Sequence, residues 1–219
     1  MLAVSLASVA APMAHSTGLV VDTITASIAA TGTFNLKDNA VIVRTTPYAT
    51  IQAYVKTGFN GAGWDGFGID SSTAAANNIS AGKNLYAVGI LDNSVGGGVY
   101  DSFFGHNTTS HDQTLARYTY YADSDLNGFV NTDDLNLWID NQNTVNSNWV
   151  FGDWDFSGFV DADDLNLYLD TAGLPPILPS PPAPPSPDLG SGVGVVPEPG
   201  AFAMMAVGIL GLLSRRNRK

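Results

Sequence analysis

The sequence predicts an α+β protein: a small strand-rich N-terminal domain with one or two short helices, then a pair of acidic loop-and-helix repeats. Two observations support this class. Short runs of β-branched and aromatic residues alternate with Gly, Asn and Asp clusters in the first half, as in strands joined by turns. Two acidic segments then repeat one pattern thirty residues apart, and each continues into a helical periodicity.

The N-terminal domain should span residues 16–118. Its expected strands are residues 34–36, 40–44, 86–91, 99–104 and 114–121. The first two flank an Asp38-Asn39 turn. Residues 48–57 predict a short helix because Ile51, Tyr54 and Val55 fall on one face, and residues 71–76 predict one further helical turn. Five glycines around Trp64 predict a long loop between them.

The acidic repeats cover residues 123–140 and 153–170, and eleven of their eighteen aligned positions are identical. Each repeat places oxygen-bearing side chains at loop positions 1, 3, 5, 9 and 12 and a glycine at position 6. This spacing is that of a twelve-residue calcium loop. Gly128 and Gly158 would take the sharp turn, and Val130 and Val160 would suit a short β bridge between the loops.

Calcium requires six to eight oxygen ligands at roughly 2.3–2.6 Å, which a loop coiled around the ion can supply. We therefore predict two Ca²⁺ ions. The expected ligands of the first loop are Asp123, Asp125, Asn127, the carbonyl of Phe129, Asn131 and Asp134. Those of the second are Asp153, Asp155, Ser157, the carbonyl of Phe159, Asp161 and Asp164. The second loop should bind more tightly because it offers four carboxylates against three.

The repeated loops followed by a single helix, with an aspartate at position 12, resemble the type I dockerin over about residues 119–172. The resemblance implies two Ca²⁺ ions and docking onto a cohesin-like protein. Loop positions 10 and 11, Thr132-Asp133 and Ala162-Asp163, depart from the small hydroxyl residues common in that family. Two other interpretations stay open: acidic turns without metal, or ions that only staple the module, residues 119–173, to the protein's own N-terminal domain.

The C-terminal residues 196–219 combine a Pro197-Glu198-Pro199 motif, an apolar run and a basic cluster that includes Arg215 and Arg216. An apolar helix held by positive charge is typical of a membrane stop-transfer segment. Its thirteen to fifteen apolar residues are fewer than the roughly 20 that a comfortable span needs, which favours a transient anchor. An ordinary tail anchor is the alternative.

This order of motif, apolar run and basic cluster resembles the PEP-CTERM sorting signal. The resemblance implies processing by an exosortase-type enzyme, transient anchoring in the inner membrane of a Gram-negative bacterium through the C-terminal transmembrane helix, and release to the cell surface or the extracellular exopolysaccharide matrix. Export also requires a signal peptide, for which residues 1–15 are the candidate. Residues 174–195, rich in Pro and Gly, should form an extended linker.

The composition limits which classes of binding partner and which chemistry the protein can have. The chain has a net charge of −11 and no cysteine, and four of its nine basic residues lie in the last five positions. Such an acidic surface makes nucleic acid an unsuitable partner, and disulfide or thiol chemistry is excluded.

No catalytic motif is recognisable, so we expect a protein that is not an enzyme. The functions that remain are attachment to a partner protein, a structural role in an exopolysaccharide matrix with calcium as an internal staple, and, less supported, carbohydrate binding or processing.

Overall fold

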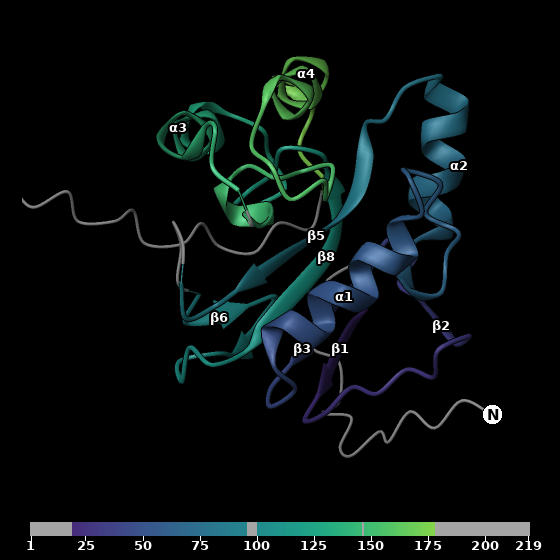
Figure 1. The fold of residues 1–219 in the computed structure, drawn as a ribbon. Helices are drawn as coiled ribbons and strands as arrows, with labels where there is room; N and C mark the ends of the chain where they lie inside the picture. Colours follow the sequence, from purple (N-terminus) through teal and green to yellow (C-terminus); the bar gives the residue numbers. More distant parts are fainter. Residues whose placement is uncertain (1–18, 96–99, 146, 178–219) are drawn as a thin grey trace, which may run out of the picture. The chain divides into compact units, whose positions relative to one another are not determined.

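The computed structural model describes residues 19–95, 100–145 and 147–177 (Figure 1). These residues contain both helices and strands, in agreement with the expected α+β class. The expected signal peptide, residues 178–195 of the linker and the C-terminal sorting segment lie outside the described residues. Within the described residues, no helix has the length and apolar character that crossing a membrane demands.

A four-stranded mixed sheet organises the protein. Its order is β1 (Val20–Thr23), β3 (Ala40–Val43), β8 (Thr114–Tyr120) and β5 (Tyr86–Asp92). The first pair is parallel, whereas β8 is antiparallel to both of its neighbours. All seven residues of β8 are buried, which indicates that both faces of the sheet are covered at its centre.

Two small sheets complete the strands. In one, β2 (Thr33–Asn35) runs parallel to β4 (Gly68–Asp70), and in the other β6 (Ser102–Phe103) pairs with β7 (His106–Asn107). The sequence placed strands on both sides of the Asp38-Asn39 turn, but these strands do not pair with each other. The second, β3, is fully buried between β1 and β8, so its partners are non-local strands that a local turn signal does not reveal.

The helices begin close to their predicted positions. They are α1 (Tyr48–Phe59), α2 (Ser72–Ala81), α3 (Thr132–Asn141) and α4 (Ala162–Thr171), with a short 3-10 helix, η1, at Trp149–Phe151. The single turn expected at residues 71–76 is instead the ten-residue α2. Capping residues determine where α2 begins and ends. The Ser71 hydroxyl accepts a hydrogen bond from the Ala74 N–H, and Gly82 ends the helix in the left-handed conformation.

Both repeat helices begin with a capping box formed by the loop that precedes them. Asn131 and Asp161 are the N-caps, and the carboxylates of Asp134 and Asp164 accept hydrogen bonds from the N-cap backbone N–H groups. Loop positions 9 and 12 therefore start the helix as well as belonging to the loop. Each loop and its helix fold as one unit.

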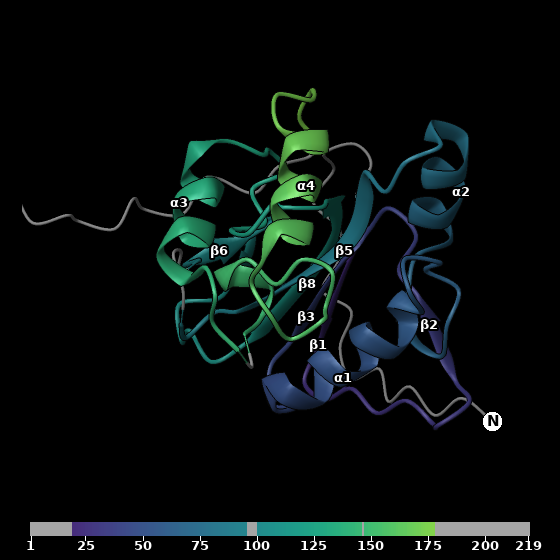
Figure 2. The same cartoon turned by 45° about the horizontal axis from the view of Figure 1, so that its top comes forward.

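The two repeats exchange backbone hydrogen bonds. The N–H of Asn143, just after α3, donates to the Val160 carbonyl at 2.8 Å, and the N–H of Gly173, just after α4, donates to the Val130 carbonyl at 3.4 Å. The two valines were expected to bridge each other, but each bonds the residue that follows the other repeat's helix. In keeping with this pairing, α3 and α4 lie side by side in both views (Figures 1 and 2).

The repeats share one hydrophobic core with the sheet. Trp149 and Trp154 are fully buried, and the ring of Phe156 lies 5.3 Å from that of Phe59 in α1 and 6.3 Å from that of Trp64. Gly89 in β5 lets Leu126 and Trp149 pack closely against the strand. A Cβ there would lie 2.5 Å from the Leu126 side chain and 3.0 Å from the Trp149 indole nitrogen.

We predict that Gly89→Ala lowers the free energy of unfolding by about 2 kcal/mol, the usual range for overpacking a core. Urea unfolding checks this, with Gly105→Asn as control. Gly105 has open space around it and a left-handed backbone that asparagine tolerates. Equal midpoints for the parent protein and Gly89→Ala would contradict the close contact between β5 and the repeats.

Candidate metal centres

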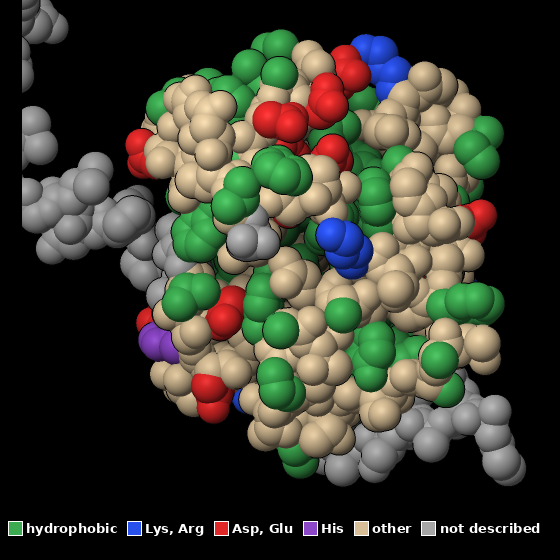
Figure 3. Space-filling view, viewed as in Figure 1, with side chains coloured by type: hydrophobic (Ala, Val, Ile, Leu, Met, Phe, Trp, Pro, Cys, Tyr) green, Lys and Arg blue, Asp and Glu red, His purple; other side chains and the backbone are tan. Residues whose placement is uncertain are grey.

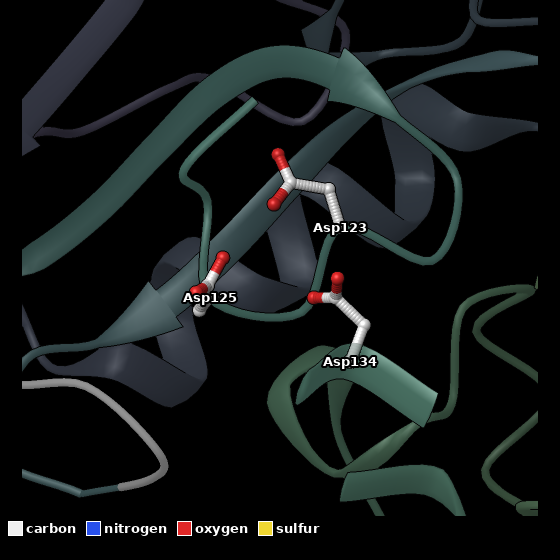
Figure 4. Close-up of side chains that lie close together, drawn as sticks. All are labelled: Asp123, Asp125 and Asp134. Carbon is white, nitrogen blue, oxygen red and sulfur yellow. The ribbon is translucent and has the colours of Figure 1, made fainter. Parts of the chain in front are cut away.

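Three aspartates of the first loop converge on one point. One oxygen from each of Asp123, Asp125 and Asp134 lies within 4.8 Å of the others, and Figure 4 shows their carboxylates turned toward a common space. Asp123 and Asp125 belong to the turn that leaves β8, whereas Asp134 lies in the first turn of α3. All three side chains are buried.

Backbone N–H groups fix these carboxylates in place. Asp123 accepts a hydrogen bond from the Gly128 N–H at 2.9 Å, and Asp125 accepts one from the Asn127 N–H at 3.0 Å. Asp134 accepts from the N–H groups of Ser124 and Asn131, at 2.8 and 2.9 Å. The loop is thus wound around its own acidic side chains.

The second loop repeats this arrangement position by position. Asp153, Asp155 and Asp164 also have oxygens within 4.8 Å of one another. Asp164 accepts hydrogen bonds from the Trp154 and Asp161 N–H groups, at 2.7 and 3.0 Å. Gly158 donates to Asp153 at 3.1 and 3.2 Å.

The backbone follows the same course in both loops. Gly128 and Gly158 both have φ 90°, and the residues at loop position 4, Leu126 and Phe156, have φ 59° and 58°. The sharp turn at the position-6 glycine is therefore where the sequence placed it.

The other expected ligands have local roles. Asn131 and Asp161 cap their helices by accepting hydrogen bonds from Asp133 and Asp163 N–H groups, at 2.6 and 2.8 Å. Asn127 donates through its amide to Asp125 at 2.8 Å, and the Ser157 hydroxyl donates to the Phe159 carbonyl at 3.3 Å. Whether these groups and the carbonyls of Phe129 and Phe159 ligate a metal stays a prediction.

Burial changes the acidity of the converging carboxyls. It raises the pKa of Asp134 to about 8, with a further rise from the charge of Asp125, and it raises the pKa of Asp164 to about 7 and of Asp153 to about 6. The pKa values of Asp123 and Asp125 are raised by the same burial. Each trio therefore resists holding three negative charges without a cation.

Side chains from outside the first loop hold its backbone, and no sequence motif predicted these contacts. The indole N–H of Trp149 donates to the Asp123 carbonyl at 2.7 Å, and the Tyr100 hydroxyl donates to the Asp125 carbonyl at 2.7 Å. The guanidinium of Arg117, in β8, donates to the Leu126 carbonyl at 3.1 Å. No spacing rule connects such distant residues to the loop.

The second repeat also supports the first loop directly. The Trp154 indole N–H donates to the Ser124 hydroxyl at 3.0 Å. Trp154 occupies position 2 of the second loop, and its contact with the first loop was not predicted from the sequence. The hydroxyl of Thr119, in β8, donates a hydrogen bond to the Asp123 carboxylate.

The donor chemistry fits calcium. Both sites present hard oxygen atoms only, with neither His nor Cys, and such sets suit Ca²⁺ rather than Zn²⁺. Within residues 19–95, 100–145 and 147–177, they are also the only groups of three His, Cys, Asp or Glu side chains arranged closely enough to hold an ion.

The two sites differ in their access to solvent. In the first, Asp123, Asp125, Asn127 and Asp134 are all buried. In the second, Asp153 and Asp164 are buried, Asp155 is half-buried, and Ser157 and Asp161 are exposed. The first site is thus built into the core, and the second opens toward water.

Comparison with known protein families gave one match, and it covers only the C-terminal segment. The sequence pattern of the PEP-CTERM protein-sorting motif matches residues 195–219. The match supports the sequence-based assignment of this segment and indicates an exported protein of Gram-negative bacteria, processed at a membrane by an exosortase. It does not extend to residues 119–172, for which the dockerin likeness stays a hypothesis. No curated protein and no solved structure matched the chain.

In the metal-free protein, the free energy of unfolding should fall as the pH rises from about 4 to about 8. The raised pKa values mean that the native state binds more protons than the unfolded state within this window, so deprotonation destabilises the native state. Urea unfolding in chelator across this range measures the effect. The double variant Asp134→Asn, Asp164→Asn should show a weaker dependence, and a stability that rises with pH in the parent would contradict the argument.

Proposed function

We propose that this exported protein is a calcium-stapled component of a cell surface or extracellular matrix. One Ca²⁺ in each loop would neutralise a trio of buried carboxylates and hold the two repeats against the protein's own N-terminal sheet. The observation that carries the proposal is the convergence of two equivalent carboxylate trios directly beside shared core residues such as Trp149 and Trp154.

In the first loop, Asp123, Asp125 and Asp134 would hold the ion, and in the second Asp153, Asp155 and Asp164 would hold it. The ion supplies positive charge at the place where the three side chains repel one another. Because Asp134 and Asp164 are also capping residues, ion binding would stabilise the starts of α3 and α4. The helices would in turn keep the side chains of Trp138 and Tyr168 packed on the hydrophobic core.

The intramolecular role is favoured by where the aromatic residues lie. Trp149, Trp154 and Phe156 belong to the same buried cluster as Trp64 and Tyr121. The Thr171 hydroxyl at the end of α4 donates to the Tyr121 carbonyl at 3.0 Å, and the Trp64 indole N–H donates to the Tyr121 hydroxyl at 3.0 Å. Through Tyr121, these two hydrogen bonds connect the end of α4 to Trp64 of the N-terminal domain.

Attachment to a cohesin-like protein is the second candidate function. It is favoured by Ile139 and Leu169, which hold equivalent positions on α3 and α4 and are 45% and 66% exposed. Exposed apolar residues on paired helices suit a protein–protein contact. Acidic side chains gather over α4 (Figure 3), so such a partner would present basic groups.

Calorimetric titration of the protein with Ca²⁺ tests the proposal. The parent should bind two ions, and Asp164→Asn should bind one, because the variant removes a negatively charged carboxylate from the second site. Asp163→Asn is the matched control, since Asp163 is exposed and outside the trio. Two ions bound to Asp164→Asn, or none bound to the parent, would contradict the proposed sites.

Chelation separates the staple from the attachment role. If calcium is an internal staple, chelator should lower the unfolding midpoint of the parent, and Ile139→Ser with Leu169→Ser should leave that effect unchanged. Capture of a partner protein that is lost in this double variant but kept in Asp163→Asn would support attachment instead.

A further inference from the structure

An open groove lies apart from the carboxylate trios, between α1, residues 28–30 and residues 65–68. Its volume is about 750 Å³, within the range of small-ligand sites. We propose that this groove binds an uncharged carbohydrate chain. The proposal goes beyond the calcium-stapled role and does not depend on it.

One wall of the groove is built to present an aromatic ring. Gly66 and Gly68 press against α1 so closely that a Cβ would lie 2.0 Å from the Thr57 carbonyl oxygen or 2.3 Å from that of Tyr54. Phe67, between them, is 55% exposed and lines the groove together with the half-buried Tyr54. Two aromatic residues thus offer apolar surface on which a sugar ring can pack.

The polar side chains beside the two aromatic rings are held in position by a hydrogen bond between them. The Asn60 amide donates to the Asp65 carboxylate at 2.9 Å, and both side chains are exposed in the lining. The pair leaves an amide N–H, an amide oxygen and carboxylate lone pairs for hydroxyl groups, which both donate and accept hydrogen bonds. A few placed polar groups among apolar walls are what fixes a small ligand in one orientation.

The loop that carries Asp65 is strained. Ala62 and Trp64 have φ 73° and 51°, values that side-chain-bearing residues other than Asn and Asp rarely adopt. Trp64 is fully buried, so its packing accounts for its own conformation, whereas Ala62 has no such partner in the core. The turn that these residues form brings Asp65 back beside Asn60, so that the two side chains hydrogen-bond.

The charges of the groove lining and of the whole chain favour an uncharged ligand. The lining holds one cationic side chain, Lys56, and one anionic side chain, Asp65, and is therefore neutral as a set. The whole chain carries a charge of −11, which repels polyanions. A neutral glycan meets these conditions better than an acidic one.

Titration calorimetry of the protein tests the proposal with cellohexaose, laminarihexaose and mannohexaose as neutral probes and hexagalacturonate as the acidic probe. At least one neutral hexasaccharide should bind, and Phe67→Ala should weaken it tenfold or more. Ile79→Ala is the matched control, because Ile79 is an apolar side chain of α2 that is 81% exposed and outside the lining. Both variants should keep the parent's unfolding midpoint and its calcium stoichiometry.

Three results would overturn the inference. They are no binding of any neutral probe at millimolar concentration, tighter binding of hexagalacturonate than of every neutral probe, or equal binding by the parent and Phe67→Ala. A synthetic peptide of residues 178–195 should not bind; if it bound and lost affinity in Phe67→Ala, the groove would be a peptide site and the carbohydrate proposal would be wrong.

Discussion

Repulsion among buried carboxylates is the constraint on which the rest of this structure depends. In each repeat, one carboxylate oxygen from each of three aspartates lies within 4.8 Å of the others. Most of these side chains have little contact with water. Burial raises their pKa values because the charged form loses its hydration. Such an arrangement is stable at neutral pH only if protons or a cation offset the charge. The proposed Ca²⁺ ions would provide that balance.

The same atoms connect this electrostatic balance to the fold. Asp134 and Asp164 stand within their trios and also cap α3 and α4, so a change at either carboxylate reaches a helix. The backbone of the first loop is in turn held by Trp149, Tyr100 and Arg117, which belong to different segments of the chain. Gly89 lets β5 approach this region closely. Loops, helices and sheet therefore form a continuous set of contacts.

Local patterns predicted part of this arrangement. The spacing of aspartates around Gly128 and Gly158 identified the residues that converge, and the apolar periodicity after each loop located α3 and α4, because both signals lie within one short segment. Pairing of β3 with β1 and β8 could not be read from the sequence, since the Asp38-Asn39 turn suggested a local hairpin. The support of the loop by Tyr100 and Trp149 and the groove beside Phe67 also depend on residues brought together only by the tertiary fold.

Hydrogen exchange of the backbone amides of β5 and β8, with and without chelator, tests the central claim most directly. If the ions hold the repeats on the sheet, chelation should raise exchange in both loops and also in β5, whose Gly89 lies against Leu126 and Trp149. Unchanged protection in β5, with faster exchange confined to residues 123–134 and 153–164, would contradict the account. The loops would then bind cations without supporting the fold.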